Sequence, residues 1–156
     1  MLSCMDYRFV DDLVAAMSEM GLQDNYDPVV LAGALLRVVN DKFADWHDTF
    51  WQHLDVSLQL HHIKQLLLID QPNCGAYKPA LREAAVSSPK HKYQMRTLAI
   101  NKFTLRVAAR YPDLKVSGFL MALDGTVQEI TIAPATEMQN TTRSTPLRPG
   151  ISGAAS

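Results

Sequence analysis

Apolar and polar positions along the chain follow two different spacings, and the changes between them predict where strands and helices lie. Residues 66–69 (Leu-Leu-Leu-Ile) are continuously apolar and are followed at once by polar and turn-forming residues. Such a run is typical of a parallel strand that is buried on both faces. The shorter β-branched run at residues 29–31, after Asp27-Pro28, predicts a second strand.

Several segments instead carry apolar residues at intervals of three and four, which is the spacing of an amphipathic helix. They lie at residues 10–20, from 43 to about 61, and between the breaks at 87–89 and 111–112. A further short helix is predicted over residues 79–86, because its proline suits the first helical turn.

Two β-rich runs near the end of the pattern, residues 116–123 and 126–132, are joined by Asp124-Gly125. This dipeptide is a strong signal for a hairpin, so the sheet should end in an antiparallel edge. Buried strands that alternate with amphipathic helices predict a three-layer α/β domain with a central, mostly parallel sheet. We assign this domain to residues 1–132. Residues 133–156 are rich in Ser, Thr and Pro without apolar periodicity, and are predicted to form a flexible tail.

Composition narrows the class of protein. The chain has 156 residues, 47% of them hydrophobic, and a formal net charge of −1. It is long enough for one domain with its own core, and it lacks the charge excess of a nucleic-acid-binding protein. Apolar runs fall short of the ~20 residues that span a bilayer, and the first residues do not resemble a secretory signal. We therefore expect a cytoplasmic protein that binds neither nucleic acid nor membrane.

Two cysteines are the strongest candidates for chemistry. Cys74 lies just past the buried strand, where ligands bind in open α/β sheets, and Gly75 allows the backbone to approach a ligand closely. Cys4, Asp6 and Arg8 stand at alternate positions, so in an extended segment their side chains would project to one side. The two cysteines could form a disulfide. In a chain without an export signal we expect them to be thiols, available to a metal.

Histidines offer a second set of possible metal ligands, but none forms a standard ligand pair with Cys4 or Cys74 in the sequence. We expect solvent-exposed or interface roles for these residues, and leave open that one of them completes a metal site. The four considered are His47, His53, His61 and His62.

An early Cys-x-Asp-x-Arg, a buried strand and a Cys-Gly-Ala-Tyr turn together resemble the β-class carbonic anhydrases. Residues 31–34, 50–55 and 60–64 resemble the small bacterial carbonic-anhydrase-like branch in particular. The resemblance covers roughly residues 2 to 132. It implies a β-carbonic-anhydrase-like fold that is amino-terminally shortened, because most of the expected first strand would precede Cys4.

The resemblance also implies a zinc site. In that family, zinc is held by a first cysteine, a histidine, and a second cysteine three residues after the histidine; here these positions are Cys4, Gln71 and Cys74. An amide oxygen is a weak, neutral ligand for zinc, which prefers thiolate, imidazole or carboxylate. Zinc binding is therefore expected to be weak or absent.

The activity implied by the resemblance is that of a carbonate dehydratase, in which zinc-bound hydroxide attacks carbon dioxide to give bicarbonate. Asp6 would accept the proton of the hydroxide, and Arg8 would hold Asp6 ionised. The family also implies a homodimer or a higher homo-oligomer with the site near the subunit boundary. An apolar face with two tryptophans on the helix after residue 43 favours self-association as well.

Replacement of the histidine by Gln71 leaves several outcomes open. Zinc could bind weakly through the Gln71 oxygen, or Asp6 could move in to complete a Cys-Asp-Cys site. If no metal binds, the chain would be a non-catalytic homologue that acts as a binding protein or an oligomer subunit. A further alternative is hydrolysis of a carbon dioxide analogue such as carbonyl sulfide.

Overall fold

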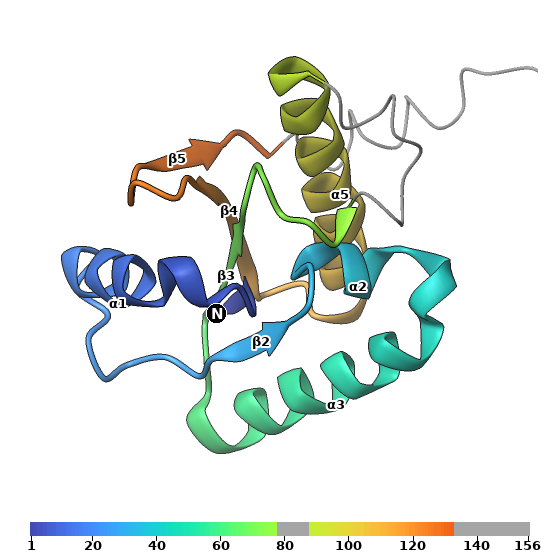
Figure 1. Cartoon of the computed structure of the whole chain (residues 1–156). Helices are drawn as coiled ribbons and strands as arrows, with labels where there is room; N and C mark the ends of the chain where they lie inside the picture. The colour runs from blue at the N-terminus through green and yellow to red at the C-terminus, as the bar shows by residue number, and fades with distance from the viewer. Residues whose placement is uncertain (78–87, 133–156) are drawn as a thin grey trace, which may run out of the picture.

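A five-stranded sheet forms the centre of the protein (Figure 1). The computed structural model describes residues 1–77 and 88–132. The strand order is β2-β1-β3-β4-β5. The pairs β2–β1, β1–β3 and β3–β4 are parallel, and the pair β4–β5 is antiparallel. The strands are β1 (Leu2–Cys4), β2 (Val29–Leu31), β3 (Gln65–Asp70), β4 (Lys115–Met121) and β5 (Val127–Ile130).

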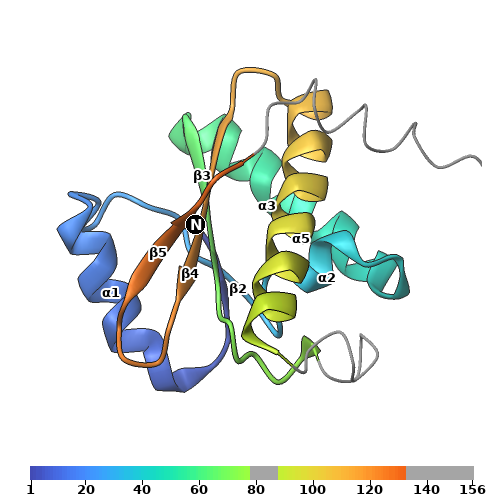
Figure 2. The ribbon, with the colours of Figure 1, turned by 90° about the horizontal axis from the view of Figure 1, so that it is seen from above.

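Helices cover both faces of this sheet, which gives the three layers predicted from the sequence (Figure 2). Helix α1 lies on one face, and α2, α3 and α5 lie on the other. Their bounds are α1 (Val10–Glu19), α2 (Leu35–Val39), α3 (Ala44–His61) and α5 (Pro89–Arg110), with 3₁₀ turns η1 (Tyr7–Phe9) and η2 (Asp41–Phe43). No helix in residues 1–77 and 88–132 is long and apolar enough to cross a bilayer.

Strand β3 contributes to the core on both sides because successive side chains point to opposite faces. Leu66 and Leu68 pack with α2, α3 and α5, whereas Leu67 and Ile69 pack with α1. All four side chains are buried. The prediction of a doubly buried strand is therefore confirmed, and so are the strand at residues 29–31 and the antiparallel hairpin.

Some expectations are corrected or fall outside the described residues. The sequence pattern does not predict helix α2, since four of its five residues are buried and apolar and give no amphipathic pattern. The aromatic face of α3 packs within the molecule: the Trp51 ring stacks on Phe103 of α5 with centroids 5.6 Å apart, and Phe50 is buried. This face is thus less available for self-association than the sequence suggested. The predicted helix at 79–86 and the tail at 133–156 lie outside the described residues.

Candidate functional site

The two cysteines meet at the carboxyl end of the sheet. Cys4 is the last residue of β1, and Cys74 follows β3, the parallel neighbour of β1. Their Sγ atoms are 3.5 Å apart, although 70 residues separate them in the sequence. The side chains are 6% and 5% exposed. Parallel pairing of β1 with β3 is what brings these two sulfur atoms together.

A tight turn after β2 forms one wall of this site. Gly33 has a φ of +84°, and its backbone N–H donates a hydrogen bond to the Cys4 Sγ at 3.4 Å. A Cβ atom at this position would lie 2.8 Å from the Cβ of Ala76, which is closer than real Cβ contacts come. Only glycine fits here, because it tolerates a positive φ and leaves room for Ala76.

Hydrogen bonds make the two thiols chemically different. The Cys74 thiol is the main cause that lowers the pKa of Cys4 to about 6, and the Gly33 N–H assists while burial opposes the shift. The pKa of Cys74 is raised, first by its contact with Cys4 and then by burial. The two sulfur atoms share one hydrogen bond, and this contact favours loss of a proton from Cys4 before Cys74.

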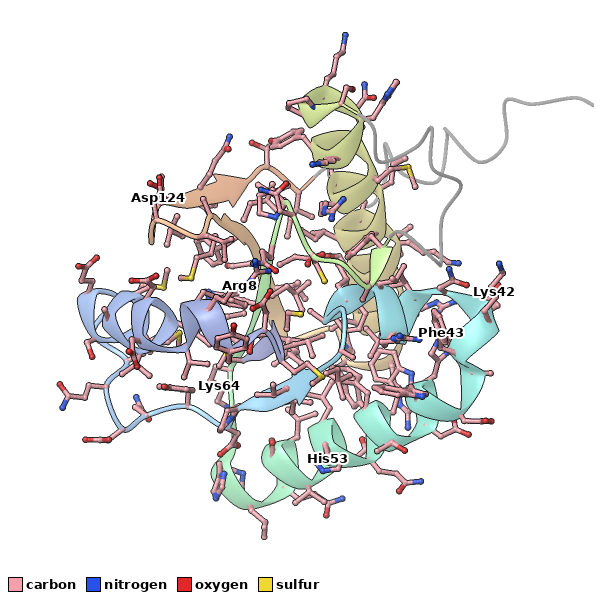
Figure 3. The ribbon with its side chains drawn as sticks, in the orientation of Figure 1. Arg8, Lys42, Phe43, His53, Lys64 and Asp124 are labelled. Carbon is pink, nitrogen blue, oxygen red and sulfur yellow. The ribbon has the colours of Figure 1, made fainter. Side chains whose placement is uncertain are left out.

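Asp6 and Arg8 lie beside the cysteines, but not in the extended segment that the sequence suggested. Strand β1 ends at Cys4, and Asp6 caps η1, accepting a hydrogen bond from the Arg8 backbone N–H at 3.2 Å. The Arg8 guanidinium reaches back to both carboxylate oxygens of Asp6. Figure 3 shows Arg8 next to the start of α1. The prediction of an extended backbone was wrong, yet the two side chains are paired.

This ion pair fixes the charge on Asp6. The Arg8 guanidinium is the main cause that holds the pKa of Asp6 well below its usual range. The Gln71 amide makes a smaller contribution in the same direction, because it lies near the carboxylate without a well-formed hydrogen bond. Asp6 is thus a carboxylate at any physiological pH and can accept a hydrogen bond from a ligand.

Gln71 is fully buried, and neither its Oε1 nor its Nε2 has a hydrogen-bond partner among the described residues. An unpartnered buried polar group costs roughly 1–3 kcal/mol, so such groups are rare unless a ligand or water meets them. The backbone of Gln71 is held firmly, since its N–H donates to Asp70 Oδ1 at 2.7 Å. The side chain therefore offers a buried amide without a well-formed hydrogen bond, near Asp6.

Beneath Gln71 lies a buried polar cluster that the sequence pattern does not reveal. The Tyr77 hydroxyl donates to the Asp70 carboxylate. The Arg96 guanidinium stacks 3.8 Å from the Tyr77 ring centroid and donates to the Gln71 carbonyl at 3.3 Å. Burial is the main cause that raises the pKa of Asp70. These contacts hold the turn from β3 to Cys74 in place, and the one sequence signal for them was an aspartate that directly follows four apolar residues.

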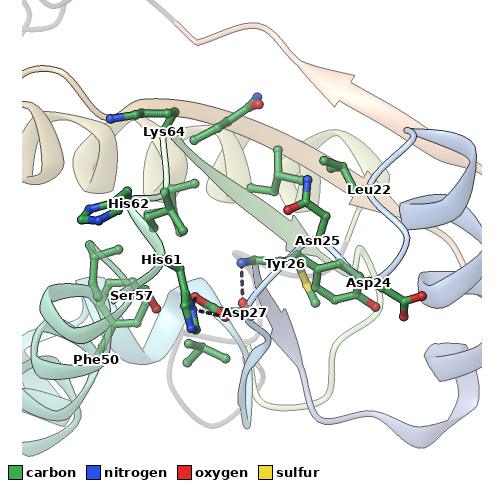
Figure 4. A pocket seen from close by; sticks show the side chains of 17 residues that line it. Leu22, Asp24, Asn25, Tyr26, Asp27, Phe50, Ser57, His61, His62 and Lys64 are labelled. Carbon is green, nitrogen blue, oxygen red and sulfur yellow. Dashed lines mark hydrogen bonds and ion pairs between the residues drawn. The ribbon is translucent and has the colours of Figure 1, made fainter. Parts of the chain in front are cut away.

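The histidines lie elsewhere. A cavity of about 660 Å³ opens at the amino ends of the parallel strands, the opposite end from the cysteines, and Figure 4 shows it. There His61 Nδ1 is 2.8 Å from an Asp27 carboxylate oxygen. His47 and His53 bond to backbone carbonyls of their own region. The described residues contain no group of three or more His, Cys, Asp or Glu side chains arranged to hold a metal.

Comparisons with known proteins place the chain among relatives in Rickettsia. It is 36% identical to an uncharacterized protein of Rickettsia bellii over 130 residues, which cover 83% of this chain and 79% of the relative. It is 35% identical to an uncharacterized protein of Rickettsia conorii over 135 residues, covering 86% and 73%. The chain belongs to the same family as these rickettsial proteins. No protein-family model matches it.

Solved structures similar to this chain include carbonic anhydrases, two of them described as β-class. The β-carbonic anhydrase CafA of Aspergillus fumigatus has a TM-score of 0.54 at 13% identity, over 89% of this chain and 77% of that one. Tetrameric β-carbonic anhydrases of Sordaria macrospora give 0.53 at 12%, over 85% and 80%. Carbonic anhydrase from Streptococcus mutans gives 0.51 at 18%, over 83% and 78%. The fold is therefore β-carbonic-anhydrase-like.

The site suits zinc only in part. Two sulfur ligands of one tetrahedral zinc ion stand about 3.8 Å apart, given Zn–S distances of about 2.3 Å. The observed 3.5 Å between Cys4 and Cys74 is close to this spacing. Gln71, which the resemblance implies as the third ligand, carries only a neutral amide, a donor that zinc does not prefer. The spacing of the two sulfur atoms thus fits zinc, whereas an amide as third ligand would fit it poorly.

Proposed function

We propose that the protein is a carbonic-anhydrase-like zinc protein that hydrates carbon dioxide to bicarbonate, at a rate reduced by Gln71. The observation that carries this proposal is the convergence of Cys4 and Cys74 beside the Asp6–Arg8 pair, 3.5 Å apart between sulfur atoms. Cys4, Cys74 and the Gln71 oxygen would hold the metal. When bound, zinc would lower the pKa of water toward neutrality and so supply a nucleophile at physiological pH.

The residues of the chain would orient this reaction. Asp6, kept ionised by Arg8, is able to accept a hydrogen bond from the attacking water and so direct an oxygen lone pair at carbon dioxide. Arg8 acts through Asp6 and is a positioning residue. A surface depression of about 450 Å³ lined by Cys4, Asp6, Arg8, Cys74 and Gly75 would admit so small a substrate.

Gln71 would weaken this site at the level of metal binding. A two-thiolate site with an amide as third donor lacks the charge and ligand strength of one completed by imidazole. Changes to residues that merely support metal ligands already cost about 10- to 100-fold in affinity or activity, and a poor direct ligand should cost more. We expect slow hydration that increases when zinc is added.

Stopped-flow hydration of carbon dioxide with a pH indicator tests the proposal. The comparison uses zinc-supplemented unaltered chain, Gln71→His and the double variant Gln71→His with Asp6→Asn. We expect a low rate for the unaltered chain and a clearly higher rate for Gln71→His. The double variant should lose that gain. If Gln71→His gives no gain although zinc is bound, the proposed reaction is wrong.

A second candidate function is a non-catalytic oligomer subunit. It is supported by exposed apolar side chains on the segment from the site into α1, since Met5, Tyr7, Val10 and Val14 are each at least half exposed. Exposed apolar patches of this kind commonly mark protein interfaces. The Sordaria macrospora structures are tetrameric, which supports homo-oligomerisation as a further proposal. Light scattering at micromolar concentration should then give at least twice the chain mass, and Tyr7→Asp together with Val14→Asp should reduce it.

A further inference from the structure

We propose that Cys4 and Cys74 form a reversible intramolecular disulfide, so that this end of the sheet is a redox-sensitive site. The inference concerns the same two thiols as the proposed function, but it requires neither bound metal nor any reaction of carbon dioxide. It rests on how the two sulfur atoms are placed and on what surrounds them.

Distance is the first support. The sulfur atoms of a disulfide are about 2.05 Å apart, so the observed 3.5 Å must shorten by about 1.5 Å. Both thiols are free, and the chain has no other cysteine. Each sulfur therefore has one possible intramolecular partner, and that partner is already in contact with it.

Local structure decides how this small movement can occur. Cys4 is held at the end of a paired strand and by the Gly33 N–H. Cys74 lies in the turn after β3, and a Cβ added to its neighbour Gly75 would meet no atom within 4 Å. Gly75 is thus loosely packed, but Ala76 lies close to Gly33 and the Gln71 backbone is held by Asp70, so the sulfur atoms must approach mainly by rotation of the cysteine side chains.

Access is the next requirement, and the site meets it. Both cysteines line the surface depression beside Asp6 and Arg8, although little of either side chain is exposed. A small reagent in the depression can reach a sulfur atom that a protein surface could not. We therefore name the oxidant by class as a low-molecular-weight disulfide, of which glutathione disulfide is an example.

The reaction consists of two thiol–disulfide exchanges. The Cys4 thiol first loses its proton to solvent, and its sulfur attacks one sulfur of the small disulfide, which forms a mixed disulfide and releases one small thiolate. The Cys74 thiol then loses its proton to that thiolate, and its sulfur attacks the Cys4 sulfur, which forms the Cys4–Cys74 bond and releases the second small thiolate. In sum, two protein thiols lose two electrons and two protons, and the small disulfide becomes two thiols.

Gln71 bears on how readily the two cysteines are oxidised, because it affects how firmly a metal would hold them. Thiolates held by a metal are poor nucleophiles toward an oxidant, whereas a site with a weak third donor leaves them free for much of the time. Once the disulfide has formed, neither sulfur is available as a thiolate ligand. Oxidation and metal binding at this site are therefore mutually exclusive.

Thiol counting on the metal-free full-length chain tests the proposal. Protein treated with a chelator is equilibrated with glutathione and glutathione disulfide at graded ratios, free thiols are blocked with an alkylating reagent, and the intact mass is measured. We expect two blocked thiols at reducing ratios and none at oxidising ratios, with a monomer mass lower by two hydrogen atoms. Digestion without reduction should then yield one peptide that joins Cys4 to Cys74, and a dithiol reductant should restore both thiols.

Matched variants separate this bond from other products. Cys4→Ser and Cys74→Ser should each end as a mixed disulfide with one glutathione, whereas Gln71→Ala should still lose both thiols. The proposal is overturned if the unaltered chain keeps two blockable thiols under conditions that modify the single-cysteine variants, or if it forms only bonds between chains. Should the serine variants fail to fold, the peptide map of the unaltered chain decides alone. The assay contains no zinc and no carbon dioxide, so its result is independent of whether the protein hydrates carbon dioxide.

Discussion

Arg8 binds both carboxylate oxygens of Asp6. Its Nε donates to Oδ1 at 2.8 Å and its Nη2 to Oδ2 at 2.5 Å. A bidentate pair of this kind is stronger and more directional than contact with a single ammonium group. It sets both the charge and the orientation of the carboxylate beside the two cysteines, which is why removal of Arg8 should be visible at Asp6 even without any ligand.

We predict that Arg8→Ala raises the pKa of Asp6 toward its ordinary value of 3.8, because the main cause of its lowering is removed. An acid whose pKa is lowered by folding stabilises the protein above its ordinary pKa and loses that contribution as pH falls through the folded pKa. The variant should therefore lose less stability on acidification than the unaltered chain. NMR titration of the Asp6 carboxyl group measures the shift. Arg110→Ala, which removes the partner of Asp55 on α3, is the control and should leave Asp6 unchanged.

Gly33 and Gly21 give a matched pair for the turn that approaches Cys4. Both have positive φ, but only at Gly33 would a Cβ clash, 2.8 Å from Ala76. Gly21→Ala should cost about 1–2 kcal/mol for the left-handed backbone alone. Gly33→Ala should cost about 1–3 kcal/mol more, since the added methyl displaces the Cys74 turn. Urea unfolding measures both, and equal costs would mean that Gly33 does not pack closely against Ala76.

Asp70 should make stability depend on pH in the direction opposite to that of a paired surface carboxylate. Burial raises its pKa above 3.8, so its contribution is full below that pH and is lost as pH rises toward the folded pKa. Asp70→Asn removes the titrating group, and from about pH 4 upward the variant should gain stability relative to the unaltered chain.

Asp124 provides the control for this prediction. Its pKa is lowered, first by the Thr126 backbone N–H, so its contribution is nearly complete above about pH 4 and the stability of Asp124→Asn relative to the unaltered chain should stay almost constant over the same range. Urea unfolding of both variants between about pH 4 and about pH 7 measures the two slopes. If the relative stability of Asp70→Asn changes as little with pH as that of Asp124→Asn, burial does not raise the pKa of Asp70.

The sequence predicted those parts of the structure whose pattern is local. Strand β3 was predicted because four apolar residues in a row have few alternatives, and the hairpin because Asp124-Gly125 favours a tight turn. The meeting of Cys4 with Cys74 followed from parallel strands that end at one edge. It depended on the resemblance as well as on spacing.

Other features could not be read from local pattern. The 3₁₀ turn at Arg8 arises because the Asp6 side chain caps it, which competes with the extended backbone that alternation assumed. The Asp70, Tyr77 and Arg96 cluster joins residues from β3, the turn and α5, and only tertiary packing brings them together. The assignment of Gln71 as a metal ligand is still a prediction.

The zinc content of purified protein tests most directly whether Gln71 occupies a metal-ligand position. Unaltered chain, Gln71→His and Gln52→His are purified, loaded with zinc, dialysed against one buffer, and analysed for zinc per chain by mass spectrometry; the last variant adds the same imidazole at an exposed position of α3. We predict that Gln71→His retains close to one zinc per chain, and that the other two proteins retain much less. Equal zinc in Gln71→His and the unaltered chain, whether high or low, would contradict the claim that Gln71 limits a zinc site formed by Cys4 and Cys74.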